Sequence, residues 1–274
     1  MEHTRWCHSM AGEEYARVYS WGHHPEFKGA YETASPCRHV DLPQTLLEPI
    51  LTKRAINRGW TLRFNTRFLR IVSHTATDDP NRDMIVSEVQ DTVFNKTYRI
   101  QSRFLFGCDG ARSQVVRELG LPLDKKPGQG LALNVLVRAD LTHLMANRTG
   151  NLHWVVRPDE ESYPPWGWGV VVRMVKPWTE WMFIFLPTPG ADLKAEEIDA
   201  SDEAYVARVK EMIGDPDVGV ELLHVGKWWI NETVAERYSD GNVYVVSLAV
   251  FFLPLFPSID LVWISCVVSS LSWR

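Results

Sequence analysis

The chain has 274 residues, of which 45% are hydrophobic and 23% charged, a balance typical of a globular protein with one large or two ordinary domains. Its 29 Lys and Arg residues against 34 Asp and Glu residues give a net charge of -5, which argues against a nucleic-acid partner. The four cysteines are far apart and form no C-x-x-C pair, so we expect neither a zinc knuckle nor a disulfide framework, and a reducing, cytoplasmic location.

The N-terminal segment MEHTRWCHSMAGEEYARVYSWG has no apolar run behind a basic start, so it does not resemble a signal peptide. The first element that we expect is a helix over 41–58, where Leu and Ile recur at helical spacing. Asp41 can cap this helix, and Pro43 suits its first turn. Pro49 removes a backbone hydrogen bond, so we expect a kink or a late start there.

After Gly59 the pattern changes to short β-rich runs. They predict strands at 60–64, 68–74, 84–90 and 97–106, interrupted by the polar loop ATDDPNRD at 76–83. A helix over 112–119 follows and ends at Gly120. A helix followed by strands and a second helix indicates an α/β unit.

The middle of the chain is β-rich. Strands are predicted at 130–138, 151–157, 168–175 and 180–186, with turn-forming Gly and Pro between them, a spacing typical of an antiparallel sheet. A helix over 203–213 and a strand over 220–230 complete this region. Six aromatic residues alternate here, and we expect most of them in a packed core and one or two in a pocket wall: Trp166, Trp168, Trp178, Trp181, Phe183 and Phe185.

The C-terminal stretch NVYVVSLAVFFLPLFPSIDLVWISCVVSSLSW carries a single charge, Asp260. About 20 apolar residues are enough to span a bilayer. Pro254 and Pro257 interrupt the run, however, and no basic cluster precedes it. A membrane anchor through residues 243–273 is therefore the less favoured of two open readings.

The stretch FLFGCDGARSQVVRELG, residues 104–120, places one carboxylate in a tight turn between a strand and a helix. Asp109 can cap a helix that begins at about Ala111 or Arg112, by accepting from its second or third N–H group. Gly110 permits an unusual backbone angle or a close approach. Helix N-termini after strands also hold phosphates and cofactors in α/β proteins, so the residues alone leave capping and cofactor binding open.

The string FGCDGARSQVVRELGL resembles the Asp-Gly fingerprint of the flavin-dependent aromatic hydroxylases, the single-component flavoprotein monooxygenases that include p-hydroxybenzoate and phenol hydroxylases. A second string, SPCRHVDLPQTLLEPIL, resembles the segment that places a glutamine against FAD, especially in the fungal dichlorophenol monooxygenase-like branch. The resemblance covers about residues 4–246. It implies FAD as cofactor, NAD(P)H as co-substrate, and a cofactor site that contains Gln44, Asp109 and Gly110. Asp109 would position the turn and transfer no proton.

The resemblance implies an α/β (α+β) fold with a partial FAD-binding Rossmann-like domain at 1–125 and a β-sheet substrate domain at 126–240. No G-x-G-x-x-G spacing occurs among the 17 glycines, so the primary pyrophosphate cradle of the family is missing. Residues 241–274, a return strand and the apolar tail, depart from the family pattern. We expect residues 247–274 to be foreign to the fold, through truncation or an unspliced intron.

The function implied is hydroxylation of a small phenol-like aromatic substrate with O2, in a chain that is truncated and inactive as written. No catalytic residue is identified. His23 and His24 lack a spaced carboxylate partner, so we expect no metal site. Two alternatives stay open, a membrane-tethered non-enzymatic remnant and a small-ligand binding module that kept the substrate domain.

Overall fold

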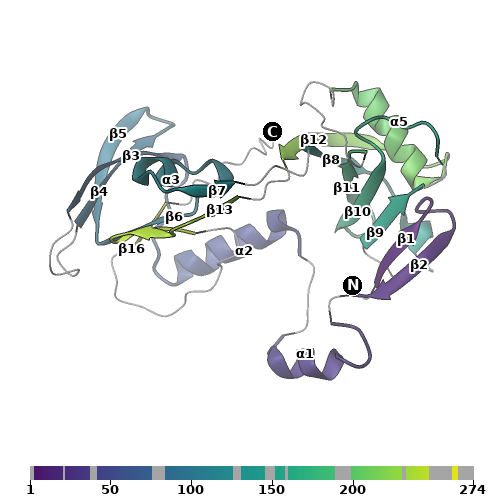
Figure 1. The fold of residues 1–274 in the computed structure, drawn as a ribbon, viewed down its shortest axis with the longest axis horizontal. Helices are drawn as coiled ribbons and strands as arrows, with labels where there is room; N and C mark the ends of the chain where they lie inside the picture. Colours follow the sequence, from purple (N-terminus) through teal and green to yellow (C-terminus); the bar gives the residue numbers. More distant parts are fainter. Residues whose placement is uncertain are drawn as a thin grey trace. The chain divides into compact units, whose positions relative to one another are not determined.

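The computed structural model describes residues 3–20, 22–37, 42–75, 84–125, 131–145, 152–157, 160–188, 199–229, 233–246 and 261–264. Contacts divide the chain into one unit of Met1–Arg54 with Pro127–Glu232 and a second of Ala55–Lys126 with Thr233–Arg274 (Figure 1). The sequence-based division into 1–125 and 126–240 differs from this, because the N-terminal strand His3–Cys7 pairs with a strand that comes more than a hundred residues later. The cofactor and substrate roles assigned to those ranges stay predictions.

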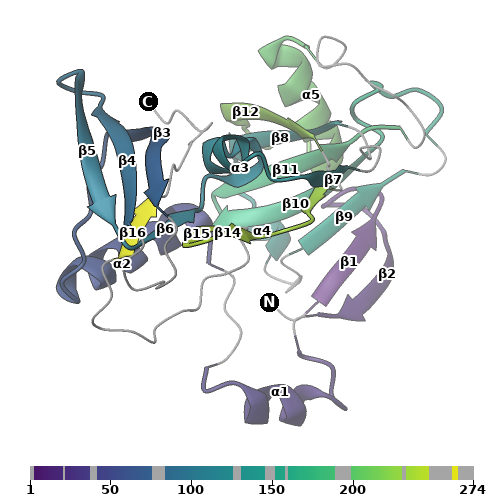
Figure 2. The same ribbon diagram turned by 60° about the vertical axis from the view of Figure 1, so that its left-hand side comes forward.

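The first unit is built on a seven-stranded sheet in the order β12-β8-β11-β10-β9-β1-β2 (Figure 2). Adjacent strands pair antiparallel except for β1 and β9, which pair parallel. The expected antiparallel sheet is therefore confirmed, and β1 and β2 are additions to it. The strands are β1 (His3–Cys7), β2 (Glu14–Tyr19), β8 (Leu131–Arg138), β9 (Leu152–Val156), β10 (Gly169–Lys176), β11 (Glu180–Leu186) and β12 (Glu221–Trp229).

One face of this sheet packs against α5 (Asp202–Ile213) in a single apolar core. Tyr205, Val209 and Met212 of α5 meet alternate residues of the strands, because successive side chains of a strand point to opposite faces. The expected core position is confirmed for four of the six aromatic residues named above, Trp166, Trp181, Phe183 and Phe185, which are at most 5% exposed. Trp168 and Trp178 are only partly buried.

The turn between β1 and β2 caps the C-terminal end of α5. Met10 N and Ala11 N donate to the carbonyl oxygens of Met212 and Ile213 at 2.9 and 2.8 Å. These are backbone acceptors that a helix leaves without partners at its C-terminal end. The N-terminal hairpin is thereby tied to the helix as well as to the sheet.

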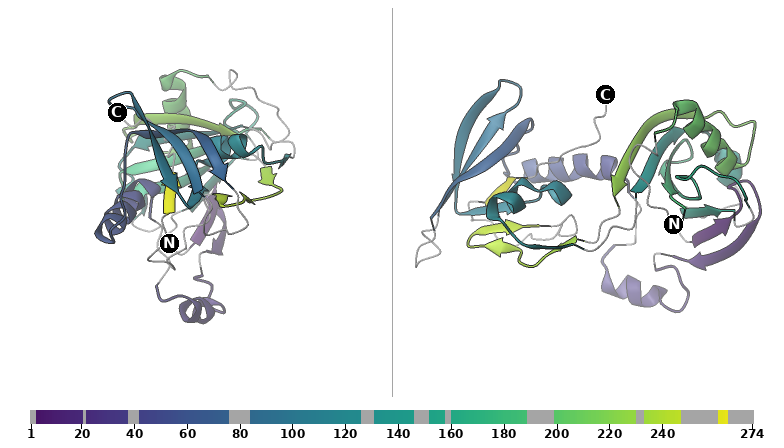
Figure 3. Two further views of the ribbon diagram at one scale, coloured as in Figure 1. Left: turned by 90° about the vertical axis from the view of Figure 1, so that its left-hand side faces the viewer. Right: turned by 45° about the horizontal axis from the view of Figure 1, so that its top comes forward.

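The second unit contains a three-stranded antiparallel sheet of β3 (Thr66–Thr75), β4 (Met84–Asp91) and β5 (Lys96–Ser102), blue in Figure 3. A four-stranded sheet has the order β14-β15-β6-β16, from β6 (Phe104–Gly107), β14 (Ser239–Asp240), β15 (Val243–Val245) and β16 (Leu261–Ile264). Two short strands, β7 (Leu123–Lys125) and β13 (Thr233–Ala235), pair with each other. Side chains of β3, β4, β6, β15 and α3 (Gln114–Leu119) form the core of this unit.

Several expectations for the second unit need correction. The strand expected at 60–64 is wrong, since these residues lie in irregular structure and a turn before β3. The run 97–106 forms two strands, β5 and β6, which belong to different sheets. The loop 76–83 lies outside the described residues.

The expected helix over 41–58 is confirmed as α2 (Gln44–Asn57), which continues through Pro49, so the late start was wrong. The proposed cap Asp41 lies outside the described residues. The remaining helices, α1 (Lys28–Ala34) and α4 (Thr142–Met145), were not expected.

Part of the apolar tail pairs with the fold. The tail segment Leu261–Ile264 forms β16, which runs parallel to β6 on the side opposite β15. This pairing is at odds with a tail that is wholly foreign to the fold, and the rest of 247–274 lies outside the described residues. Within the described ranges, no helix is both long enough and apolar enough to cross a bilayer.

Candidate functional site

The Asp-Gly turn joins β6 to α3 in the second unit. A short 3-10 turn, η1 (Gly110–Arg112), follows the strand, and Ser113 with extended ψ of 124° is the N-cap of α3. The α-helix therefore begins at Gln114, later than the sequence indicated. The extra residues let the carboxylate fold back under the start of the helix.

The side chain of Asp109 is buried, with 7% exposure, and both of its oxygens accept hydrogen bonds. Its Oδ2 accepts from Gln114 N at 2.6 Å and from Val115 N at 3.2 Å, while Oδ1 accepts from the Ser113 hydroxyl. The Ser113 Oγ in turn accepts from Val116 N at 3.0 Å. Two side chains thus satisfy three N–H groups that a helix start leaves unpaired. Asp109 does help to cap a helix, but the N-cap residue is Ser113 and the helix begins at Gln114, not at about Ala111 or Arg112.

Two glycines shape this turn for different reasons. Gly110 has a φ of +69°, a left-handed conformation, and a Cβ there would meet no heavy atom within 4 Å. Gly107, at the end of β6, allows a close approach instead, because a Cβ there would lie 2.7 Å from Val115 Cβ. Gly110 was expected from the sequence, whereas the role of Gly107 was not, since its only sign was a glycine that ends the apolar strand.

Cys108 lies between the strand and the Asp109 carboxylate and is partly buried. Burial, and secondly the charge of Asp109, raise the pKa of the Cys108 thiol above its ordinary value. The group therefore stays a protonated thiol at neutral pH. It does not have the lowered pKa of a nucleophilic cysteine.

Gln44 is the first residue of α2 and is exposed. Its Nε2 donates to Glu48 Oε1 at 2.5 Å, one turn further along the helix. An amide oxygen has two lone pairs, and this interaction uses only the NH2 end of the side chain. Gln44 belongs to the first unit, and Asp109 and Gly110 belong to the second. The surroundings of each residue are therefore described within its own unit only.

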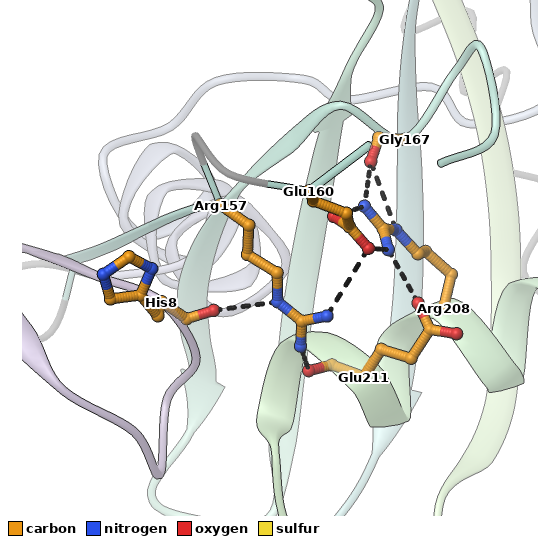
Figure 4. A network of polar contacts seen from close by, with 6 residues as sticks. All are labelled: His8, Arg157, Glu160, Gly167, Arg208 and Glu211. Carbon is orange, nitrogen blue, oxygen red and sulfur yellow. Dashed lines mark hydrogen bonds and ion pairs between the residues drawn. The ribbon is translucent and has the colours of Figure 1, made fainter. Parts of the chain in front are cut away.

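A second buried polar cluster lies in the first unit and was not anticipated (Figure 4). Arg208 of α5 is 2% exposed, and its guanidinium binds both oxygens of Glu160 at 2.8 and 2.9 Å. It also donates to the Gly167 carbonyl oxygen from Nε at 3.1 Å and from Nη2 at 2.6 Å, and to Glu211 Oε2 at 2.6 Å. Such a bidentate, fully partnered guanidinium indicates a structural role.

Arg157 extends the same cluster to the N-terminal hairpin. Its Nε donates to the His8 carbonyl oxygen at 3.0 Å, and its Nη2 donates to the Glu211 carbonyl oxygen. Hydrogen bonding from Arg208, which outweighs burial, lowers the pKa of Glu160 below its ordinary value. The only sign in the sequence was an arginine at a position of α5 that the helical period places toward the core.

Among the residues that the structure describes, no three His, Cys, Asp or Glu side chains are grouped so that they could hold a metal ion. His24 instead contacts the rings of Tyr19 and Phe27, with centroids 5.6 and 5.1 Å away.

Comparison with known proteins relates the chain to flavoproteins. Residues 1–250 match the family described as FAD binding domain. The 2,4-dichlorophenol 6-monooxygenase of Delftia acidovorans is 35% identical over 246 residues, which are 89% of this chain and 40% of that protein. The phenol 2-monooxygenase of Pseudomonas sp. (strain EST1001) is 33% identical over 243 residues, which are 89% of this chain and 36% of that protein.

Solved structures show the same relationship. The flavin-dependent monooxygenase PieE, in complex with FAD and substrate, has a TM-score of 0.74 and 35% identity, over 90% of this chain and 40% of that one. Aklavinone-11 hydroxylase, in a ternary complex with FAD and aklavinone, shares the fold with a TM-score of 0.71 at 22% identity, over 89% of this chain and 42% of that one. The chain thus spans about 40% of the length of the relatives that it matches.

Proposed function

The chain belongs to the FAD-binding domain family of flavin-dependent aromatic monooxygenases, and we propose that the whole protein uses FAD and NAD(P)H to hydroxylate a phenol-like substrate with O2. The observation that carries the proposal is the buried Asp109 turn. It is prearranged by its own hydrogen bonds and places a left-handed glycine, Gly110, three residues after the end of β6.

Two residues, each considered within its own unit, support the proposed binding of FAD. Gly110 is exposed, and the space where a side chain would stand is open, so a ligand can approach the backbone there. Gln44 is exposed and keeps an amide oxygen that can accept from a ribityl hydroxyl. When bound, FAD supplies the transfer of electrons from NAD(P)H and the activation of O2. Gln44 and Gly110 would hold it.

Asp109 has a positioning role in this proposal. Its carboxylate already accepts from two backbone N–H groups and one hydroxyl, all within the turn. Direct contact with a phosphate would also place two negative charges together. The side chain therefore fixes the backbone at Gly110 and neither touches the pyrophosphate nor transfers a proton.

The substrate proposal rests on the named relatives and on the sheet of the first unit. Two relatives that are 35% and 33% identical are, by name, monooxygenases of 2,4-dichlorophenol and of phenol. We assign the substrate-binding role to the β-rich region 126–240, and an aromatic substrate and O2 as the partners. The thiols of Cys7, Cys37 and Cys108, none of which is in a disulfide, support a reducing, cytoplasmic location.

Purification of the complete protein tests the proposal. We expect a flavin absorbance band and NAD(P)H oxidation that a phenol stimulates. The chain as written should bind FAD weakly or not at all, because it lacks the G-x-G-x-x-G cradle. A complete protein that is colourless and does not bind added FAD would refute the proposed function.

The role of the turn has its own test in the complete protein. Asp109→Ala should weaken FAD or NADPH binding by a factor corresponding to about 1–2 kcal/mol, the range for a lost cap or charged hydrogen bond. Asp124→Ala is the matched control, since Asp124 is an exposed carboxylate in the same unit. Unchanged flavin titration together with an unchanged NADPH KM would exclude the role of Asp109.

A further inference from the structure

The two faces of the seven-stranded sheet differ in burial. Across β1, β9, β10, β11 and β8, the row on the side of α5 is completely buried, with 0% exposure at Arg5, His153, Val172, Phe183 and Val135. The adjacent row on the opposite face is only partly buried at every position: Trp6, Trp154, Val171, Ile184 and Asn134. At this row the second face therefore keeps access to solvent, whereas Ala132 and Leu136, on the same face of β8 either side of Asn134, are buried.

We call this second row the open-face band. Its members are directly paired from strand to strand, and paired residues project from the same face of a sheet. At one end the rings of Trp6 and Trp154 are stacked, with centroids 6.5 Å apart and planes 18° from parallel. At the other end Asn134 pairs with Gly226 of β12, and the His224 imidazole lies beside that glycine, 3.5 Å from where a Cβ would stand. The band is thus mainly apolar, with one polar position at Asn134.

The amide of Asn134 has a defined orientation. Trp228 Nε1 donates to Asn134 Oδ1 at 2.9 Å, and an indole N–H can only donate, so the oxygen faces Trp228. The NH2 group is the free end. Over the part of the chain that the structure describes, no group accepts a hydrogen bond from Asn134 Nδ2. The band therefore offers an oriented donor to a ligand oxygen.

The spacing of the strands sets the size of a ligand that uses both ends. Asn134 lies on β8 and Trp154 on β9, and β11 and β10 stand between them. Adjacent strands lie about 4.8 Å apart, so the two positions are separated by about 14 Å. A single ring bound at Asn134 does not reach the indoles, whereas several fused rings extend over Ile184 and Val171 toward them.

We propose that the open-face band receives the aromatic substrate and selects a flat polycyclic compound bearing a phenol or quinone oxygen over a single-ring phenol. Asn134 Nδ2 donates to that oxygen, the aliphatic side chains contact the ring faces, and Trp154 stacks on the distal rings. Trp154 is then a specificity-determining residue. The inference rests on the proposed function for the existence of an aromatic substrate. It narrows the class of substrate from phenols in general to polycyclic ones.

The experiment uses the 274-residue chain without flavin and measures the binding of phenol, 2-naphthol and 1-hydroxyanthraquinone by titration calorimetry. Affinity should rise along this series. Trp154→Leu should weaken 1-hydroxyanthraquinone by about fivefold, the scale of an aromatic stacking contact, and leave phenol unchanged. Asn134→Leu should weaken all three compounds by about fivefold, the scale of one hydrogen bond.

Trp60→Leu is the control for the loss of one partly exposed indole, since Trp60 lies in the other unit and is 40% exposed. It should leave all affinities unchanged. Trp154→Phe keeps a stacking ring and should retain most of the affinity for 1-hydroxyanthraquinone. This variant shows whether the loss in Trp154→Leu comes from the missing ring or from unfolding. The proposal is overturned if Trp154→Leu and Trp60→Leu act alike, or if Trp154→Leu weakens phenol as strongly as 1-hydroxyanthraquinone.

Because the titration needs no flavin, its outcome is separate from that of the proposed function. If the complete protein is yellow but the affinity of the 274-residue chain does not rise from phenol to 1-hydroxyanthraquinone, only the proposed polycyclic substrate class is wrong. A colourless complete protein whose chain passes it would be a ligand-binding protein without the proposed chemistry.

Discussion

The Asp109 turn and the Arg208 cluster both bury a charged side chain, and they find its partners in opposite ways. Asp109 is satisfied by groups four to six residues further along the chain. Arg208 is held by Glu160 and Gly167, which are 48 and 41 residues away, as well as by Glu211 on its own helix. The turn can therefore form as soon as its own segment is in place, whereas the cluster requires the assembled first unit.

The two sites also differ in the free energy of unfolding that is lost when a buried charge or its partner is removed. A buried guanidinium that loses its carboxylate, or the reverse, leaves an uncompensated charge away from water. A lost cap leaves neutral N–H groups, for which water or relaxation of one turn can substitute in part. Substitutions at the two sites should differ in size and in extent.

The largest effect is expected for Arg208→Ala. It leaves the partly buried Glu160 carboxylate without its bidentate partner and should destabilise the first unit by about 3–5 kcal/mol. Urea unfolding of the 274-residue chain measures the change. Arg99→Ala is the control, since Arg99 is 62% exposed and 3.6 Å from Glu88, and it should change stability by less than about 1 kcal/mol. Equal losses for both variants would contradict a structural role for the cluster.

A smaller and more local effect is expected for Asp109→Ala. Two backbone N–H groups and the Ser113 hydroxyl lose their acceptor, at a cost of about 2 kcal/mol. Hydrogen exchange should show faster exchange at the start of α3 and unchanged protection in the seven-stranded sheet. Loss of protection in both places would show that the turn is not self-contained.

The two glycines of the turn are needed for different reasons, Gly107 for its close approach to Val115 and Gly110 for its left-handed backbone conformation. Gly107→Ala brings a Cβ to within 2.7 Å of Val115 Cβ and should cost about 1–3 kcal/mol through overpacking. Gly110→Asn meets open space and keeps a residue that tolerates positive φ, so its cost should stay below about 1 kcal/mol. Thermal unfolding compares the two variants. The reverse order would mean that backbone strain, not packing, dominates at this turn.

The smallest effect is expected at the surface pair of His143 and Asp215, whose Nε2 and Oδ2 are 2.8 Å apart. The hydrogen bond with His143 is the main cause that lowers the pKa of Asp215. A carboxyl group with a lowered pKa stabilises the fold above its unfolded-state value of about 3.9, and this contribution is lost as the pH falls through the folded value.

Melting temperatures between pH 5 and pH 2.5 test this pair. His143→Gln should make the decline with falling pH slightly shallower, by less than any of the changes above. The exposed Asp124→Asn serves as the control, because it removes a carboxyl group without a described partner for its side chain. A steeper decline in His143→Gln than in the unmodified chain would contradict the assignment.

The prediction of elements from the sequence succeeded where the signal was local and strong. The helix α2 and the helix α5 follow from apolar residues at helical spacing, and Gly120 ends α3 with a left-handed φ of +58°. The strand expected at 60–64 was wrong because an alternating pattern alone does not form a strand. Its apolar residues Trp60, Leu62 and Phe64 alternate as in a strand, yet no strand in the described part of the chain pairs with them, and they remain 40%, 42% and 71% exposed.

The sequence by itself determined that Asp109 lies in a tight turn and helps to cap the following helix, because a carboxylate, a glycine and the N–H groups of that helix lie within one short segment. It could not determine that β1 pairs with β9, that Arg208 meets Glu160, or that Trp154 and Asn134 share one face of a sheet. Those relations depend on which strands are neighbours and in which register. Strand order is a property of the assembled sheet, since hydrogen bonds between strands join residues that no local pattern relates.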